Sequence, residues 1–254
     1  MLESGIGALI TGGAKRIGRS ISLDLAAHGF PVAIHSNDSV EEAETLAQVI
    51  NRDGGFARVV QANLTDSVST SSLVDRAVEA IGPIGIVVNN ASIFENDSLT
   101  DFNPQVWDGH FAIHVKAPSL IAQAFARYVG TDAEGLIVNM IDQRVWRPNP
   151  RFYSYTLSKA ALWMATQTMA QALAPNIRVN AIGPGPTLAN ERQSPEDFEK
   201  QVEGLILRRG PDLPHFGATV RYLWETPSIT GQMIALDGGQ HLAWETPDII
   251  GMAE

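Results

Sequence analysis

Three residues that can move protons lie close together in the second half of the chain. Asp142 lies thirteen positions before Tyr155, and Lys159 follows Tyr155 by four. Residues four apart share one face of a helix, so the Tyr155 and Lys159 side chains can point into one cleft. A tyrosine titrates near ~10, and a neighbouring ammonium favours the phenolate, so such a pair can move protons near neutrality. The same spacing also fits an ordinary amphipathic helix, so the assignment depends on the other motifs.

Asp142 indicates what kind of molecule could react there. We expect it at the end of a strand, facing Tyr155. An ionised aspartate cannot donate a hydrogen bond to a carbonyl oxygen, but it can accept from ring N–H or amino groups. It could also pass a proton through Tyr155 if its pKa were raised. A substrate rich in N–H donors and reduced at C=N therefore suits Asp142 better than a simple ketone. Alternatively, Asp142 only caps a turn and catalysis is crippled.

A glycine-rich loop near the start of the chain predicts a phosphate site. It contains Gly12, Lys15, Arg16, Ile17 and Gly18, between an expected strand and an expected helix. Small residues let backbone N–H groups approach a pyrophosphate at the helix N-terminus, where the helix dipole favours negative charge. A tight strand-to-helix turn also needs glycine, so the motif alone does not decide between the two interpretations.

The end of the second strand favours NADP over NAD. NAD-binding proteins usually place an acidic residue there, to bind the ribose 2′-hydroxyl. Here Ser36 occupies that position, followed by Asn37 and Asp38. Lys15 and Arg16 in the first loop could meet a 2′-phosphate, whereas Asp38 would repel one unless it points away. We therefore predict NADPH/NADP as the cofactor.

Short apolar runs alternate with longer helical stretches along the chain. This alternation predicts a single α/β domain over residues 1–254, with a doubly wound parallel sheet of the Rossmann type. The expected strands are 7–10, 32–35, 56–61, 84–88, 136–141, 177–181 and 232–236. The expected helices are 16–28, 40–52, 104–128, 152–174 and a short one from 194–195 to about 207. The Pro- and Gly-rich segment 183–214 breaks the rhythm and is predicted to be a substrate lid.

Composition excludes several classes of function. The net charge of −10 argues against a nucleic-acid surface, and it means that an anionic cofactor must be held by local groups. Cysteine is absent, so disulfides and thiolate chemistry are excluded. No apolar run is long enough for a membrane span, and residues 1–5 lack the features of a signal peptide. We expect a cytoplasmic protein with a small-molecule substrate, no membrane or nucleic-acid partner and no metal.

Taken together, the motifs resemble those of the short-chain dehydrogenases/reductases over nearly the whole chain. The motifs are Thr11 to Gly18, Asn89-Asn90-Ala91, Tyr155-Thr156-Leu157-Ser158-Lys159, Pro184-Gly185 and Asp237-Gly238-Gly239. Within that family the chain is most similar to pteridine reductases and bacterial dihydromonapterin/dihydrofolate reductases. The features shared with them are Lys15 to Arg19, Ser92 followed by Phe94, Asp142 in place of the usual serine, and Gln240-His241-Leu242.

The resemblance implies roles for individual residues. Tyr155 would be the proton donor, and Lys159 would bind nicotinamide ribose hydroxyls and lower the tyrosine pKa. The cofactor would be lined by Asn89, Ala91, Asn63, Leu64, Pro184 and Gly185. Ser92 and Phe94 would meet the pterin.

His114 lies where many members of the family carry an Asn that orders a relay water. It could hold that water or be a core histidine. The resemblance also implies a homotetramer, which fits the apolar residues in the tail 240–245.

Three functions remain open from the sequence. The leading prediction is an NADPH-dependent reductase of a pterin or dihydropterin, with Asp142, Tyr155 and Lys159 as catalytic residues. The second is a general carbonyl or 3-oxoacyl reductase, which needs a hydrogen-bond donor where Asp142 stands. The third is a catalytically weak NADP-binding regulatory module, which Asp142 and His114 favour and the Tyr155–Lys159 pair opposes.

Overall fold

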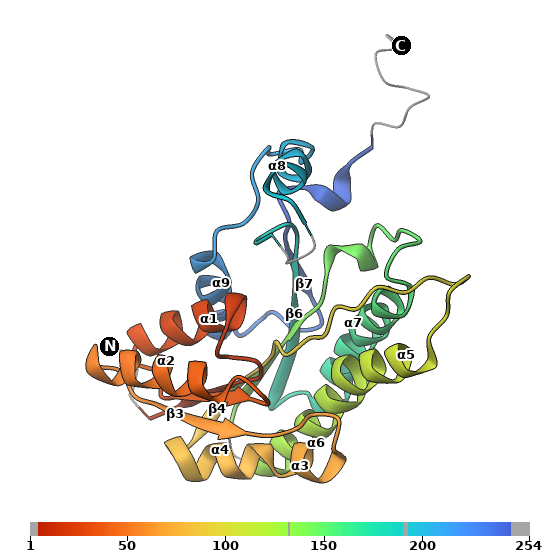
Figure 1. Cartoon of the computed structure of the whole chain (residues 1–254). Coiled ribbons are helices and arrows are strands. Elements are labelled where there is room, and N and C mark those ends of the chain that lie inside the picture. Colours follow the sequence, from red (N-terminus) through yellow and green to blue (C-terminus); the bar gives the residue numbers. More distant parts are fainter. Residues whose placement is uncertain (1–4, 132, 190–192, 245–254) are drawn as a thin grey trace.

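The computed structural model describes residues 5–131, 133–189 and 193–244 (Figure 1). In these residues seven parallel strands form one sheet in the order β3-β2-β1-β4-β5-β6-β7. The strands are β1 (Gly7–Ile10), β2 (Val32–Ser36), β3 (Ala57–Gln61), β4 (Ile84–Asn89), β5 (Gly135–Met140), β6 (Ile177–Pro184) and β7 (Met233–Leu236). Every expected strand is present, and the predicted doubly wound parallel sheet is confirmed.

Helices cover both faces of the sheet, and each face has its own apolar core. One face carries α1 (Arg16–Ala27), α2 (Val40–Arg52) and α9 (Pro214–Glu225), and the other carries α4 (Leu73–Ile81), α6 (Ala117–Val129) and α7 (Tyr153–Leu173) (Figure 1). Successive strand residues point to opposite faces, so Ala8 and Ile10 join the first core and Leu9 joins the second.

Three helices were not expected from the sequence. A short α3 (Ser67–Ser71) begins at Asp66, whose side chain accepts from the N–H groups of Val68 and Ser69. The Ser/Thr-rich stretch of α3 has no apolar periodicity, so only its cap marks it. The other two unexpected helices are α4 and α9. Helix α9 is joined to α1 by a hydrogen bond from the Arg221 guanidinium to the Asp24 carboxylate at 2.7 Å.

The prediction of one long helix over 104–128 is wrong in one respect, because a π-helical segment divides it into two α-helices. Asn103 caps α5 (Pro104–Phe111) as predicted, accepting from two N–H groups of the first turn. The π-helical segment Ala112–Lys116 follows, and then α6 begins. The Ala117 N–H bonds to the Ala112 carbonyl, one residue further back than in an α-helix. His114 lies inside this segment.

Within the segment 183–214, helix α8 (Pro195–Glu203) is shorter than the expected helix to about 207. Residues 190–192 of that segment, residues 1–4 and Glu245 of the tail lie outside the described residues. None of the described helices is both long and apolar enough to cross a bilayer. Nor do the described residues gather three or more His, Asp or Glu side chains able to hold a metal ion.

Candidate active site

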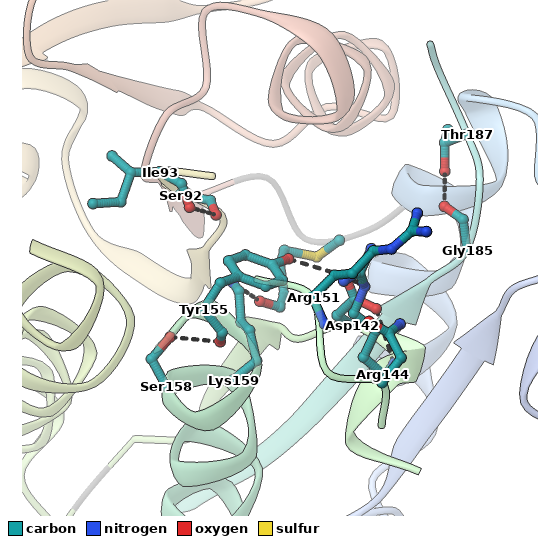
Figure 2. A network of polar contacts seen from close by, with 12 residues as sticks. Ser92, Ile93, Asp142, Arg144, Arg151, Tyr155, Ser158, Lys159, Gly185 and Thr187 are labelled. Atoms are coloured by element: carbon teal, nitrogen blue, oxygen red, sulfur yellow. Dashed lines mark hydrogen bonds and ion pairs between the residues drawn. The ribbon is translucent and has the colours of Figure 1, made fainter. Parts of the chain in front are cut away.

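Asp142 and Tyr155 meet at the carboxyl end of the sheet (Figure 2). Asp142 lies two residues beyond β5, and Tyr155 lies in the first turn of α7. The Tyr155 hydroxyl donates to Asp142 Oδ2 at 3.0 Å, and Asp142 Oδ1 accepts from the backbone N–H of Arg144 at 2.9 Å. Lys159 lies one turn further along α7, where its ammonium donates to the Met140 carbonyl at 2.8 Å. The three residues selected from spacing are therefore brought together.

Burial governs the titration of all three groups. It raises the pKa of Asp142, while the Arg144 N–H, the Arg144 guanidinium and the Tyr155 hydroxyl partly oppose that rise. Burial and then the Asp142 carboxylate hold the pKa of Tyr155 well above 10. Burial lowers the pKa of Lys159 to about 8. The sequence predicts a lowered tyrosine pKa; the shift is in the opposite direction chiefly because the hydroxyl is buried, and secondly because Asp142, rather than the ammonium, is the charge bonded to it.

A cleft of about 640 Å³ runs from the glycine-rich loop to these residues. Gly12 adopts φ +60°, and a Cβ on Gly18 would lie 2.1 Å from the Gly12 carbonyl oxygen, so glycine is required at Gly18. No side chain caps the N-terminus of α1, and its first turn has no acidic residue. Uncapped N–H groups at a helix N-terminus suit a phosphate group, so the cleft fits the predicted dinucleotide.

The basic residues of the loop have protein partners. Lys15 pairs with Glu42 of α2 at 2.6 Å, and both side chains are about half exposed. The Arg16 guanidinium donates to the carbonyls of Leu188 and Ala189, each at 3.2 Å, and so joins the loop to the segment 183–214.

His35 holds the loop from beneath. Its Nδ1 accepts from the Gly12 N–H at 3.1 Å, so the other ring nitrogen donates to the Ala62 carbonyl.

The residues predicted around the adenosine lie at the ends of β2 and β3. Ser36 is buried as the last residue of β2, and the Asn37 amide donates to Asp38. Asn63 accepts from Thr65, and Leu64 is buried in the core. None of the four predicted residues (Ser36, Asn37, Asn63 and Leu64) borders the cleft between the glycine-rich loop and Tyr155.

The paired asparagines Asn89, the last residue of β4, and Asn90, which follows it, have different roles. The Asn89 amide points into the core and donates to Asn139, which donates to Thr166. The Asn90 amide donates to the carbonyls of Thr11 and Gly12, and Asn90 borders the cleft. The sequence interpretation chose Asn89 and missed Asn90, because neighbouring strand residues point in opposite directions and the motif does not say which faces the cleft. Three other residues predicted to line the cofactor, Ala91, Pro184 and Gly185, border the cleft.

Phe94 and Ser92 border the cleft from the loop after β4. The Phe94 ring stacks on Phe152 with centroids 4.1 Å apart and meets the Tyr155 ring edge-on at 4.7 Å. The Arg144 guanidinium lies 5.6 Å from the Phe94 ring and 5.1 Å from the Phe152 ring. A second chamber of about 810 Å³ adjoins this wall and is also bordered by Arg151 and Gln201. No sequence motif marks Phe152, because its contact with Phe94 depends on the turn that begins α7.

Comparisons with known proteins identify the family of this chain. The profile of the short chain dehydrogenase family matches residues 7–200. Two crystal structures of FolM alternative dihydrofolate reductase 1, both in complex with NADP, superpose with a TM-score of 0.93. The Brucella suis protein is 60% identical, over 96% of this chain and 98% of that one. The Brucella canis protein is 61% identical, over 96% of this chain and 97% of that one.

A more distant relative points to the wider family. The 3-oxoacyl-(acyl-carrier-protein) reductase FabG of Staphylococcus aureus is 30% identical over 240 residues, which cover 92% of this chain and 98% of that protein. The resemblance inferred from the motifs is thus confirmed, including the likeness to dihydrofolate reductases of this fold. The chain belongs to the short-chain dehydrogenase family.

Proposed function

We propose that this protein is an NADPH-dependent reductase of a C=N bond in a pterin or dihydropterin. The observation that carries the proposal is the Asp142 carboxylate, held at 3.0 Å from the Tyr155 hydroxyl at the end of the cleft. A carboxylate there accepts hydrogen bonds from N–H and amino groups and would repel the negative charge that develops on a ketone oxygen. The two Brucella proteins named as dihydrofolate reductases, at 60% and 61% identity, support the same substrate class.

NADP(H) is the proposed occupant of the cleft. Its pyrophosphate would lie on the backbone of Gly12, Ile17 and Gly18 at the N-terminus of α1. Lys15 and Arg16 would meet the 2′-phosphate after leaving Glu42 and the Leu188 and Ala189 carbonyls. Both Brucella neighbours were crystallised with NADP.

The remaining cofactor roles follow the order of the chain along the carboxyl edge of the sheet. Ser36 and Asn37 would face the adenosine ribose, and Asn63 and Leu64 the adenine. Asn89 would support the cofactor site from the core side, through its bond to Asn139, and Asn90 and Ala91 would border the cofactor itself. Lys159, Pro184 and Gly185 would complete the site at the nicotinamide end.

The reaction needs a hydride and a proton. NADPH, when bound, would supply the hydride to the ring carbon of the C=N bond and leave as NADP⁺. Tyr155 is neutral, because its pKa lies well above 10, and its O–H donates the proton to the ring nitrogen. Asp142 accepts hydrogen bonds from the substrate as a carboxylate; when its Oδ2 takes up a proton from solvent, it donates that proton to the Tyr155 oxygen and so frees the Tyr155 O–H for the ring nitrogen. The raised Asp142 pKa favours this uptake. The Asp142 side chain is 20% exposed, so solvent can replace its proton.

Lys159 and Arg144 stabilise these changes in charge. With a pKa of about 8, Lys159 is cationic below that pH and stabilises negative charge on Tyr155 during transfer. The Arg144 N–H holds Asp142 Oδ1 at 2.9 Å, which leaves Oδ2 directed at the tyrosine. Phe94 and Ser92 form the wall along which a flat heterocycle would stack, an arrangement worth roughly 0.5–1.5 kcal/mol beyond burial.

The segment 183–214 is proposed as the lid of this site. Leu188 borders both the cleft and the outer chamber, and Phe198 and Gln201 of α8 border the chamber. The Arg16 contacts with the Leu188 and Ala189 carbonyls support coupling between the lid and the glycine-rich loop. Amide hydrogen exchange should slow in residues 195–203 when NADP binds. Unchanged exchange there would oppose the lid assignment.

Initial rates test the function directly. With NADPH, kcat/KM for dihydrobiopterin, dihydromonapterin or dihydrofolate should exceed that for simple ketones and 3-oxoacyl thioesters. Tyr155→Phe serves as the control for background reduction, since it keeps the ring and loses the transferable proton. Higher activity on ketones than on pterins would contradict the proposal.

A general carbonyl or 3-oxoacyl reductase is the second candidate, favoured by the 30% identity to the Staphylococcus aureus FabG reductase. Such an enzyme needs a donor to the substrate oxygen at position 142. Asp142→Ser should therefore increase ketone turnover and decrease pterin turnover in our protein if the first proposal holds. An enzyme that already prefers ketones with Asp142 intact would support the second candidate.

We also propose a homotetramer. Apolar side chains are exposed on α7 and at the end of the described chain, among them Met164 at 60% and Trp244 at 68% exposure. Contiguous exposed apolar patches are typical of subunit contacts, and we propose that these side chains belong to such patches. Light scattering after gel filtration should give four times the chain mass, and a monomer or dimer would contradict this proposal.

A further inference from the structure

Two histidines lie one helical turn apart beside the catalytic tyrosine. His110 lies in the last turn of α5, His114 lies in the π-helical segment, and both side chains are buried. Their rings stack at a centroid distance of 5.5 Å, and each meets the Tyr155 ring edge-on, at 5.8 Å and 5.4 Å. Only His114 was singled out from the sequence, as a possible holder of a relay water.

Each histidine bridges the same two parts of the chain. The loop after β4 contacts both Nε2 atoms. The Ile93 N–H donates to His114 and the Glu95 N–H donates to His110, each at 3.3 Å, and Ser92 Oγ also lies 2.9 Å from His114 Nε2. On the other side, His114 Nδ1 lies 2.8 Å from Ser158 Oγ, and His110 Nδ1 lies 2.7 Å from Ser154 Oγ. Ser154 and Ser158 of α7 stand on either side of Tyr155 in the sequence.

The bonding pattern assigns the protons. A backbone N–H can only donate, so each Nε2 must be an acceptor and each ring proton must lie on Nδ1. His110 and His114 therefore donate to the two serine hydroxyls, and Ser158 passes its own proton to the Tyr155 carbonyl at 2.8 Å. The arrangement requires uncharged rings. Burial, the main cause, lowers the pKa of both histidines, that of His114 well below 6.5.

The same loop also caps the catalytic helix. Both carboxylate oxygens of buried Asp97 accept from the Ser154 N–H at 3.1 Å. The residue at the N-cap of α7, Phe152, has φ +55° and makes no side-chain cap of its own. The N-terminus of α7 is therefore held by Asp97 from another segment, and Ser154 is bonded to that segment both directly and through His110.

We propose that His110 and His114 are positioning residues that form an uncharged clamp between the loop 92–97 and α7. The clamp sets the separation of the two groups it joins: Phe94, which lies on the loop, and Tyr155, which lies between the two serines. Both ring nitrogens of His114 are bonded to protein atoms, so His114 holds the loop rather than a relay water. The effect on substrate, but not the clamp itself, rests on the function proposed above.

The tautomers provide a test that needs no substrate. In the ¹⁵N-histidine-labelled protein at pH 7, long-range proton–nitrogen NMR should show both rings neutral with the proton on Nδ1. The two signals would be assigned by their loss in His110→Asn and His114→Asn. A proton on Nε2, or a charged ring, at either position would overturn the clamp whatever the enzyme reduces.

Kinetics tests the positioning role. His110→Phe keeps an aromatic ring but loses both hydrogen bonds, whereas His110→Asn keeps an amide donor for Ser154. We expect kcat/KM for the best substrate to fall roughly 10- to 100-fold in His110→Phe, as for a misplaced reacting group, and less in His110→Asn. The Kd for NADPH should stay within about twofold of the wild type, since the clamp does not border the cofactor end.

His28→Phe, at the exposed histidine that follows α1 as its C-cap, is the matched control and should have the same kcat/KM as the wild type. Unchanged kcat/KM in folded His110→Phe would overturn the positioning role. If His110→Phe does not fold, His110→Asn replaces it in the test. A kcat/KM below that of the wild type, with both ring protons on Nδ1, would support the positioning role, and an unchanged kcat/KM would overturn it. Wild-type inactivity on every pterin would instead remove the proposed function and leave the tautomer test intact.

Discussion

Tyr155 donates a hydrogen bond to the Asp142 carboxylate across 3.0 Å, and this contact joins the first turn of α7 to the end of β5. It replaces the tyrosine–ammonium pair expected from the spacing of Tyr155 and Lys159. The ammonium bonds to the Met140 carbonyl, so the negative charge of Asp142 acts directly on the tyrosine. The two acids therefore act as a pair that shares its protons.

The raised pKa of Asp142 predicts the pH dependence of reduction. Proton delivery needs the protonated carboxyl, so kcat/KM for a dihydropterin should fall as pH rises through the Asp142 pKa, which lies above 3.8. Tyr155 stays protonated over the pH range in which the protein can be assayed, because its pKa lies well above 10, so its titration does not contribute to the pH profile of kcat/KM. Asp142→Asn should lower kcat/KM roughly 10²- to 10⁴-fold and abolish the limb. A falling limb of the same midpoint in the variant would assign the titration to another group.

Buried His35 predicts that stability decreases in acid. Its pKa is lowered from 6.5 to about 4, chiefly by burial, so the unfolded chain takes up a proton that the folded protein excludes. The contribution is fully present above pH 6.5 and is lost as pH falls toward 4, by up to about 3 kcal/mol at roughly 1.4 kcal/mol per pKa unit.

Urea unfolding at pH 7.5, 5.5 and 4.5 measures this loss. His35→Gln has no titrating group at this position, so its free energy of unfolding should depend less on pH between 6.5 and 4. The variant should also be less stable than the wild type at every pH. Parallel curves for the two proteins would show that His35 is not the group responsible.

Gly18→Ala should abolish dinucleotide binding. The added Cβ would lie 2.1 Å from the Gly12 carbonyl oxygen and 2.5 Å from Asn90 Nδ2, so the loop must move from beneath the phosphate site. Gly5→Ala is the control, because an added Cβ there would have no neighbour within 4 Å. Quenching of tryptophan fluorescence by NADPH should be lost in the first variant and kept in the second. NADPH affinity retained by Gly18→Ala would place the phosphate elsewhere.

Glu42 is expected to weaken NADPH binding, because it holds Lys15 at 2.6 Å. Glu42→Gln should tighten NADPH by roughly two- to fivefold, since an exposed ion pair is worth little, and the gain should shrink in salt. Affinity for NADH, which has no 2′-phosphate, should not change. Glu41→Gln removes an equal charge without touching the pair, so equal tightening in both variants would reveal a long-range field effect.

Most of the strands and helices could be predicted from short stretches of the sequence. Buried parallel strands such as Ile84–Asn89 are continuous apolar runs, and the bounds of β1 and α2 are as expected. Helix α3 could not be read this way, because it depends on the Asp66 cap. The π-helical turn around His114 leaves no mark in apolar periodicity either.

At the site, the sequence by itself determined which chemical groups are present and roughly where. Glycine spacing reports local backbone needs, and i, i+4 spacing reports a shared helix face, so Gly12, Gly18, Tyr155 and Lys159 could be found without coordinates. Only the tertiary structure decided which charge meets Tyr155, that Asn90 rather than Asn89 borders the cleft, and that His110 and Asp97 hold α7. These contacts join residues far apart in the chain, and side-chain direction across such distances is set by how strands and helices pack rather than by any local pattern.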